Sequence, residues 1–182
     1  MLFYSDERTR SLEREEKMID CVEYLFDKWN GDRNNVPLML KLAITIWYTF
    51  DMDGKELSLT REEQYYLGNM MNNVYCYFMR HRARDENCQW VFSYIMTVRT
   101  ENFLYCISDL LLIEKIGACL NELSAEAGNV FAQYFEALEN FGRKSKEMIK
   151  YQKRAIEQIP NTFDESQEID RYFIRILNSK FL

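Results

Sequence analysis

Turn-forming residues are scarce in this chain, which has only two prolines and six glycines among its 182 residues. Sheet proteins of this length need many tight turns, and such turns draw on these two residues. Apolar residues also recur at intervals of three and four, the spacing of one helical face. The sequence therefore predicts an all-α protein of about eight helices, arranged in a bundle or a short repeat-like stack.

Helix stop and cap signals divide the chain without an intervening linker, so we expect a single domain over residues 1–182. The densely charged segment 1–17, at the start of the first helix, is expected to project. Thr60 and Glu63 have the spacing of a capping box, and Gly142 and Pro160 are expected to end the sixth and seventh helices. The expected helices span about 6–30, 37–50, 61–80, 86–98, 100–116, 124–141, 144–159 and 164–177.

The third expected helix carries aromatic residues on more than one face, at Tyr65, Tyr66, Tyr75, Tyr77 and Phe78. One interpretation, which we prefer, is a central helix packed on several sides. The other is an aromatic groove for a partner, because aromatic residues and methionine are enriched at interfaces.

Residues 124–160 carry a partial repeat pattern. Ala155 is followed five residues later by Pro160, Tyr151 occupies an aromatic position, and Gly142 lies near the turn between two helices. This pattern resembles a tetratricopeptide repeat, and the resemblance covers about 37 of the 182 residues. The family has a second small residue in this helix, and at that position this chain has Met148 or Glu147, depending on the register. The resemblance implies a stack of paired helices that holds a partner.

Metal and cofactor sites are not indicated. The segment 51–62 has the length of a calcium loop, but Lys55 and Glu56 occupy places that require an oxygen ligand and a glycine. The five cysteines form no Cys-x-x-Cys pair, so a zinc knuckle is excluded and a reducing cytoplasm is the simplest setting. No glycine-rich phosphate loop is present, and we expect no cofactor.

His81 is the only histidine and lies within a basic run that includes Arg80 and Arg84. The helical HEPN ribonucleases place an arginine four to six residues before the histidine, and this chain has none there. A basic helix end in solvent explains the run, because cations are favoured at the carbonyl end of a helix. A metal-free nuclease centred on these three residues is retained as an alternative.

Charge is distributed unevenly along the chain, whose net charge is −6. Residues 101–142 contain seven acidic residues and one lysine, whereas residues 143–154 contain six basic residues and one glutamate. These segments either face each other, remain solvated, or form docking surfaces. We assign partner-binding roles to Asp109, Glu114, Glu122, Glu126, Glu136 and Glu139.

These features predict a non-enzymatic, cytoplasmic, helical protein that binds a basic protein partner. No membrane segment is expected, and nucleic acid is disfavoured as a partner. A concrete version is an immunity protein that neutralises a basic toxin. The alternatives are a helical-repeat regulator or adaptor that binds peptides, and the nuclease described above.

Overall fold

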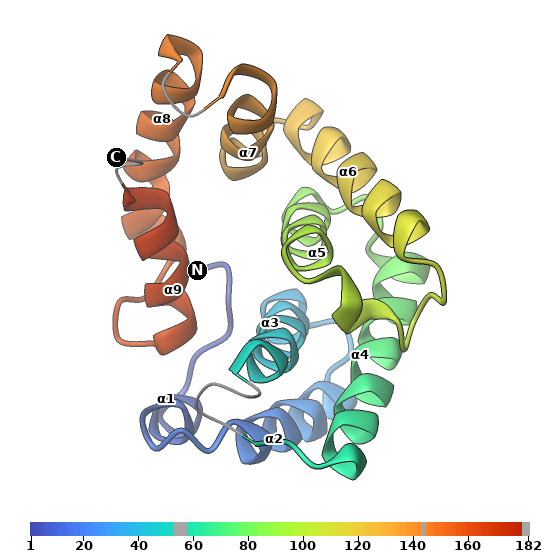
Figure 1. The fold of residues 1–182 in the computed structure, drawn as a ribbon. Helices are drawn as coiled ribbons and strands as arrows, with labels where there is room; N and C mark the ends of the chain where they lie inside the picture. Colours follow the sequence, from blue (N-terminus) through green and yellow to red (C-terminus); the bar gives the residue numbers. More distant parts are fainter. Residues whose placement is uncertain (53–57, 143–144, 180–182) are drawn as a thin grey trace.

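The computed structural model describes residues 1–52, 58–142 and 145–179, and these residues form only helices and connecting segments (Figure 1). The predicted all-α fold is confirmed. In chain order the elements are α1 (Glu7–Arg14), α2 (Met18–Gly31), α3 (Val36–Met52), α4 (Arg61–His81), α5 (Glu86–Val98), the 3-10 helix η1 (Thr100–Phe103), α6 (Leu110–Glu126), α7 (Val130–Phe141), α8 (Lys146–Thr162) and α9 (Glu168–Asn178).

Side-chain caps begin several helices. Thr60 accepts a hydrogen bond from the backbone N–H of Glu63, whose carboxylate accepts one from the N–H of Thr60 at 2.7 Å, so the predicted capping box is confirmed. Asp85 caps α5 by accepting hydrogen bonds from the backbone N–H groups of Asn87 and Cys88. Gly142 follows α7 with φ of 76°, a backbone conformation that favours glycine.

The first expected helix is two helices. Glu16 has φ of 56°, and the N–H of Lys17 donates to the carbonyl of Leu12 at 2.9 Å, which closes the end of α1. The segment 1–17 does not project, because Leu12 and Glu13 are buried where α1 packs on α2 and α9. The charged sequence concealed this contact, since α1 buries only Thr9, Leu12 and Glu13.

Two expected helix starts are also wrong. The expected helix 100–116 is divided into η1 and α6, and Asp109 caps α6 by accepting from the N–H of Leu112 at 3.2 Å. Ser124 lies in the last turns of α6, where its hydroxyl donates to the carbonyl of Glu86 at 2.7 Å. Asn129 caps α7 instead. Ser, Thr, Asp and Asn are all good caps, so sequence alone does not select among neighbouring candidates.

Pro160 lies inside the last turns of α8 and does not end the helix at Ile159. The helix continues past it, and the N–H of Phe163 donates to the carbonyl of Ile159 at 2.9 Å and closes the final turn. At the other end, Ser145 caps α8 through the N–H of Met148 at 3.0 Å. The expected start of this helix, Lys144, lies outside the described residues.

α3 is the central helix of the fold. Every residue from Leu38 to Trp47 is buried, including Lys41. The hydroxyls of Thr45 and Thr49 each donate to the carbonyl four residues earlier at 2.7 Å, which satisfies both groups within the helix. The preferred expectation that helix 61–80 is central is therefore wrong, and its equivalent α4 leaves Tyr65 64% exposed.

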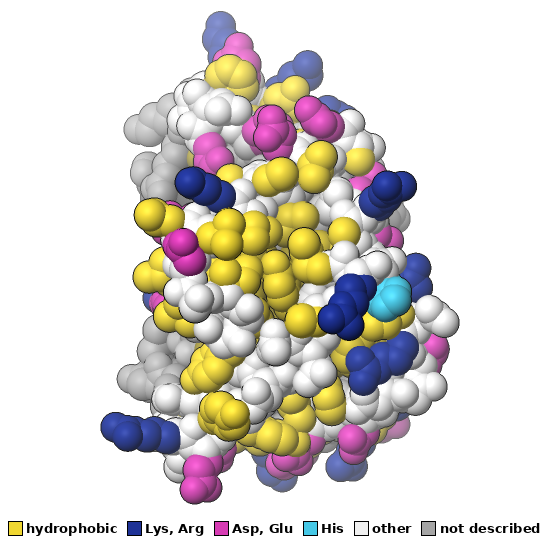
Figure 2. All heavy atoms as spheres, turned by 90° about the vertical axis from the view of Figure 1, so that its right-hand side faces the viewer, with side chains coloured by type: hydrophobic (Ala, Val, Ile, Leu, Met, Phe, Trp, Pro, Cys, Tyr) yellow, Lys and Arg dark blue, Asp and Glu magenta, His cyan; other side chains and the backbone are white. Residues whose placement is uncertain are grey.

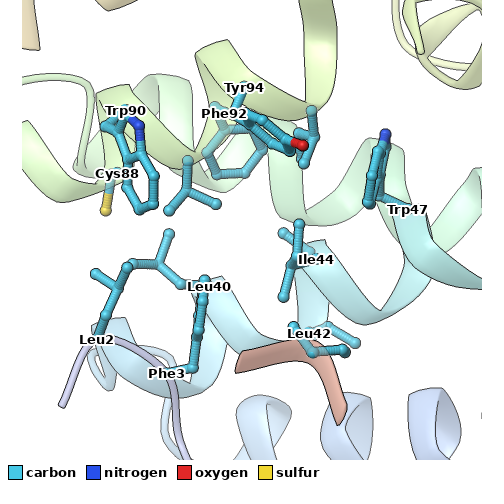
Figure 3. Close-up of a cluster of buried hydrophobic side chains, with 14 of the residues drawn as sticks. Leu2, Phe3, Leu40, Leu42, Ile44, Trp47, Cys88, Trp90, Phe92 and Tyr94 are labelled. Carbon is cyan, nitrogen blue, oxygen red and sulfur yellow. The ribbon is translucent and has the colours of Figure 1, made fainter. Parts of the chain in front are cut away.

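Helices α5 to α9 pack on one another in chain order, and α9 returns to contact α1 and α3 (Figure 1). The N-terminal segment completes this closure, because the N–H of Leu2 donates to the carbonyl of Thr162 at 2.9 Å. The ring of Phe3 packs against Phe163 and Phe173, with centroids 6.1 and 5.6 Å apart. In Figure 3, Leu2 and Phe3 lie near Leu40 of α3, below Trp90 of α5.

A buried ion pair joins α1 to α3. Lys41 Nζ contacts the carboxylate of Glu13, and neither side chain is more than 1% exposed. The other oxygen of Glu13 accepts from the N–H of Glu168 at 3.0 Å, at the start of α9. One charged contact thus connects three helices that are distant in sequence.

Asp170 of α9 lies in the same buried region. Its Oδ2 accepts from the N–H of Asp164 at 2.6 Å and from Gln167 Nε2 at 3.2 Å, but its Oδ1 has no hydrogen-bond partner among the described residues. Burial raises the pKa of Asp170 to about 6, against the opposing attraction of Lys41, and the neighbouring carboxylates Glu13 and Asp164 also raise it.

We expect Lys41→Met to lower the free energy of unfolding by about 3–5 kcal/mol at neutral pH, because it leaves Glu13 buried without a cation. Adding Glu13→Gln should recover most of this loss, since the amide oxygen still accepts from the N–H of Glu168 without carrying charge. Urea denaturation measures both variants. A double variant no more stable than Lys41→Met would show that the ion pair is not the cause.

The raised pKa of Asp170 gives a second prediction. Protonated Asp170 stabilises the folded state fully below pH 4, near its ordinary pKa of 3.8, and this stabilisation is lost as the pH rises through about 6. Asp170→Asn mimics the protonated form, so the variant should gain up to about 3 kcal/mol over the parent at pH 7 and little at pH 4. Urea denaturation across this range tests the sign. A variant less stable than the parent at pH 7 would show that the attraction of Lys41 outweighs desolvation.

Candidate partner-binding surfaces

α6 has apolar residues on more than its buried side. Ile113, Gly117 and Leu120 are buried in the fold. A second apolar stripe follows the spacing i, i+4, i+7 and i+11, which places its members on one further side of the helix. These residues are partly or largely exposed: Leu112, Ile116, Cys119 and Leu123.

This second stripe faces away from α7. The side of α6 that meets α7 is marked by Asn121, whose Nδ2 donates to the carbonyl of Ala132 at 3.4 Å, and by Ala118, which lines a cavity with Phe135. The exposed stripe lies on the opposite flank. That flank is directed toward η1 and α4, both of which lie with α6 on the right of Figure 1.

The facing flank of α4 is built around a close contact with Tyr105, which follows η1. The ring of Tyr105 lies so close to Gly68 that an added Cβ there would overlap it. Tyr105 also stacks on Phe50 of α3, with centroids 6.0 Å apart and planes inclined by 17°. Residues of α4 on the same flank as Gly68 include Tyr65, Cys76 and Met79.

Together these two flanks form one exposed surface, which we call the α4–α6 apolar face. Figure 2 shows a continuous apolar area, hollowed at its centre, on this side of the molecule. Monomeric proteins rarely expose large contiguous apolar areas unless they bind something there. The face consists of Tyr65, Cys76, Met79, Tyr105, Leu112, Ile116, Cys119 and Leu123.

The contact with Tyr105 gives a third prediction. Gly68→Ala should destabilise the fold by about 1–3 kcal/mol, because the methyl group forces the ring of Tyr105 away from α4. Gly31→Ala is the matched control, since an added Cβ there meets no atom within 4 Å. Thermal unfolding of the two variants measures the difference. Equal stabilities would mean that Tyr105 moves without cost.

The predicted partner-binding acidic residues do not have one common role. Asp109 caps α6, so its carboxylate already has a structural hydrogen bond. The other five lie on α6 and α7, where the antiparallel register set by Asn121 and Ala132 brings Glu114 level with Glu139. We call these five the α6–α7 acidic surface: Glu114, Glu122, Glu126, Glu136 and Glu139.

These five carboxylates form no ion pair with any described residue, and neither does the lysine of α6, Lys115. Ion pairs occur elsewhere in the described chain, for example between Asp6 and Lys28 at 3.1 Å and between Asp51 and Arg99 at 2.6 Å. The acidic surface therefore presents charge that the fold does not neutralise internally.

Two cavities divide this surface. Glu126 and Glu136 line one of about 290 Å³ together with Tyr151 of α8. Glu139 lines another of about 250 Å³, together with Trp90 and other residues of α5 and α6. The five carboxylates thus cover a broad curved area, and they do not converge on a single pocket.

The basic strip of α8 does not neutralise them. The cations of Lys150 and Arg154 lie over the ring of Tyr151, with Nζ 6.0 Å and Cζ 5.7 Å from its centroid. No ion pair connects the described cations of α8 with the α6–α7 acidic surface. Arg143 and Lys144, which belong to the same strip in sequence, lie outside the described residues.

The single histidine lies at the exposed end of α4. The ring of His81 packs against Tyr77, with centroids 4.6 Å apart, and Tyr77 in turn contacts Trp29 edge-on. Arg82 donates to the backbone carbonyl of Asn34 at 3.3 Å, while Arg80 and His81 remain exposed. No carboxylate forms an ion pair with His81 in the part of the chain that the structure describes.

Candidate metal ligands and two of the cysteines can be placed in the described residues. No group of three or more His, Cys, Asp or Glu side chains there is arranged to hold a metal ion. Residues 53–57 of the calcium-loop segment lie outside the described residues. Burial raises the pKa of the Cys21 and Cys106 thiols to about 12, which keeps them protonated and unreactive.

The described helices include none that is both long and apolar enough to cross a membrane. No family model, curated protein or solved structure matches this chain. The helix pair that carries the repeat resemblance is observed as α7 and α8, with Ala155 fully buried. Membership in the tetratricopeptide-repeat family stays a prediction.

The alternative of an aromatic groove on helix 61–80 includes Tyr65, but sequence reasoning missed the contribution of α6 to the α4–α6 apolar face. The signal was present in α6, where apolar residues occupy both the core side and the 112–116–119–123 stripe. The wrong helix boundary at Thr100 concealed it, because the apolar residues were distributed over one expected helix that ended too early. Tyr105 carried no local signal, since its role depends on the contact with Gly68.

Proposed function

We propose that this chain is a non-enzymatic protein-binding protein, and specifically an immunity protein that binds and neutralises a basic toxin. The observation that carries this proposal is the α6–α7 acidic surface, whose carboxylates have no ion-pair partner among the described residues. A surface of one sign accelerates encounter with a partner of the opposite sign and selects against others.

The position of these carboxylates supports a broad protein contact. They extend over the outer sides of α6 and α7 and around two cavities, and a contact with the surface of another protein would cover an area of this kind. A small ligand would instead need several polar groups converging on one enclosed site.

The other candidates have weaker support. A peptide-binding repeat protein uses the inner side of its helical arc, but here aromatic residues such as Trp90, Phe163 and Phe173 fill that side. A nuclease at His81 would need groups that activate a nucleophile, whereas the ring of His81 packs against the ring of Tyr77.

The experiment uses tagged chain to capture its partner from an extract of the native host, followed by purification of that partner. We expect a basic protein whose toxic activity is inhibited at a one-to-one ratio. The triple variant Glu114→Lys, Glu136→Lys and Glu139→Lys should weaken binding at least tenfold, and added salt should weaken the parent in the same direction.

The matched control reverses three exposed acidic residues elsewhere, at Glu7, Glu157 and Glu165. This control has the same net charge as the triple variant and should bind within about threefold of the parent. Equal losses in both variants would assign the effect to net charge alone and reject the α6–α7 acidic surface as the docking site.

A further inference from the structure

A cavity of about 250 Å³ lies between α5, α6 and α7. Helix α5 lines it with one helical face, from Trp90 at one end to Val98 at the other. Side chains of α6 and α7 complete the wall: Ala118, Asn121, Phe135 and Glu139. The cavity is therefore a space between three packed helices, separate from the aromatic core on the inner side of the arc.

The cavity has a buried floor and an open mouth. Trp90 and Ser93 are 0% and 3% exposed, whereas Val98 is 44% exposed and Glu139 is also exposed. An α-helix rises about 1.5 Å per residue, so the floor and the mouth lie roughly 10–12 Å apart along α5. This shape suits an elongated small molecule that enters from the side of Glu139.

The floor presents an unpaired hydrogen-bond donor. Nε1 of Trp90 is buried and has no hydrogen-bond partner among the described residues. Trp29 and Trp47 also have an unpaired Nε1, but Trp90 is the one that lines this cavity. In Figure 3 the nitrogen of Trp90 lies on the side of its ring nearer to Tyr94 and away from Leu2. Because a buried unpaired donor is unfavourable, an oxygen atom of a ligand at the floor would stabilise it.

Two further polar groups of the cavity can serve a ligand. The hydroxyl of Tyr94 shares a hydrogen bond with that of Tyr172 at 2.7 Å, and the hydroxyl of Thr97 donates to the carbonyl of Ser93 at 3.0 Å, so the fold uses these groups. The hydroxyl oxygen of Ser93, one turn after Trp90 on the same face of α5, can accept a hydrogen bond. At the mouth, the carboxylate of Glu139 forms no ion pair with a described residue.

Aromatic rings form the middle of the cavity. The rings of Tyr94 and Phe135 lie with centroids 5.4 Å apart and planes inclined by 50°, which offers two surfaces for a further ring. A cavity of about 150 Å³ is sufficient for benzene. The cavity of about 250 Å³ therefore has room for one aromatic ring and a short chain, on the order of ten non-hydrogen atoms.

We infer that the cavity between α5, α6 and α7 binds a small phenolic amine. The phenol hydroxyl lies at the floor, where it accepts from Nε1 of Trp90 and donates to the hydroxyl oxygen of Ser93. The ring packs against Tyr94 and Phe135, and the ammonium lies at the mouth beside Glu139. Each polar atom of the ligand thus has a partner of the opposite kind.

This site goes beyond the proposed function, because the amine binds without a protein partner. Of the five carboxylates of the α6–α7 acidic surface, Glu139 lines the cavity. The tests below measure binding of the amine to the chain alone. Their outcome is therefore independent of whether a basic toxin binds.

Isothermal titration calorimetry of the purified full chain with 4-hydroxyphenethylamine tests the inference directly. We expect one molecule to bind per chain with a dissociation constant on the order of 10–100 μM, as is reasonable for a ligand of about ten non-hydrogen atoms. A dissociation constant above about 1 mM would overturn the inference.

Two analogues test the two polar ends of the ligand. Phenethylamine lacks the hydroxyl and should bind at least about tenfold more weakly, because the N–H of Trp90 stays unpaired. 4-Hydroxyphenylacetate carries a carboxylate where the amine has its ammonium, and repulsion by Glu139 should also weaken it at least about tenfold. Equal affinities for the three compounds would show apolar binding without the inferred contacts, and would overturn the inference.

The mouth is tested with Glu139→Gln, which should raise the dissociation constant of the amine about tenfold. Glu157→Gln on α8 makes the same change at an exposed position outside the cavity, and should leave the constant within about twofold of the parent. Equal effects of the two variants would assign the loss to net charge and overturn the site.

The cavity volume is tested with Ala118→Leu, which places a larger side chain in the wall and should raise the dissociation constant at least about tenfold. Cys119→Leu is the matched control at the next residue of α6, which is also exposed and does not line the cavity. Circular dichroism checks that both variants fold. Unchanged binding by Ala118→Leu would overturn the location of the site.

The floor is tested with Trp90→Phe, which removes the indole N–H and keeps an aromatic ring. The preference for 4-hydroxyphenethylamine over phenethylamine should fall from at least about tenfold to about twofold. Because both compounds are measured on the same variant, a loss of stability does not produce this change. A preference equal to that of the parent would overturn the contact with Trp90, and the variants at Glu139 and Ala118 decide the site if Trp90→Phe does not fold.

Discussion

Burial of α3 from Leu38 to Trp47 is the constraint on which the rest of this structure depends. A helix buried on every side needs neighbours on every side, and Lys41 near its middle also needs a buried counter-charge. Glu13 supplies that charge, which brings α1 onto the core and requires the break at Glu16. The hydroxyls of Thr45 and Thr49 donate to backbone carbonyls of α3 itself, so they need no polar partner from another helix.

The same constraint closes the chain on itself. Glu13 accepts from the N–H of Glu168, so the partner of Lys41 also sets where α9 begins. Because α9 is held against α1 and α3, the N-terminal segment reaches the end of α8. There the N–H of Leu2 donates to the carbonyl of Thr162. The inner side of the helical arc becomes an aromatic core and is lost as a binding groove. Binding surfaces are thereby confined to the outer sides of the helices.

Two outer surfaces result, and they differ in kind. The α6–α7 acidic surface is polar and curved, and its carboxylates lack internal ion-pair partners among the described residues. The α4–α6 apolar face is hollowed at its centre and exposes large apolar side chains of both helices (Figure 2). α6 contributes side chains to both surfaces.

The sequence by itself determined the helical class, the Thr60 capping box, the end of α7 at Gly142 and the acidic character of α6 and α7, because periodicity, caps and charge are local properties. It did not reveal that Glu13 is buried, that the long helix expected from Thr100 begins only at Leu110, that Ser124 lies within α6, or that α4 lies at the surface. Those outcomes depend on competition between helices for the core, which no local pattern reports. Only the tertiary structure decided which apolar stripe of α6 is buried and which remains exposed, because both have the same spacing and differ only in the helices that reach them.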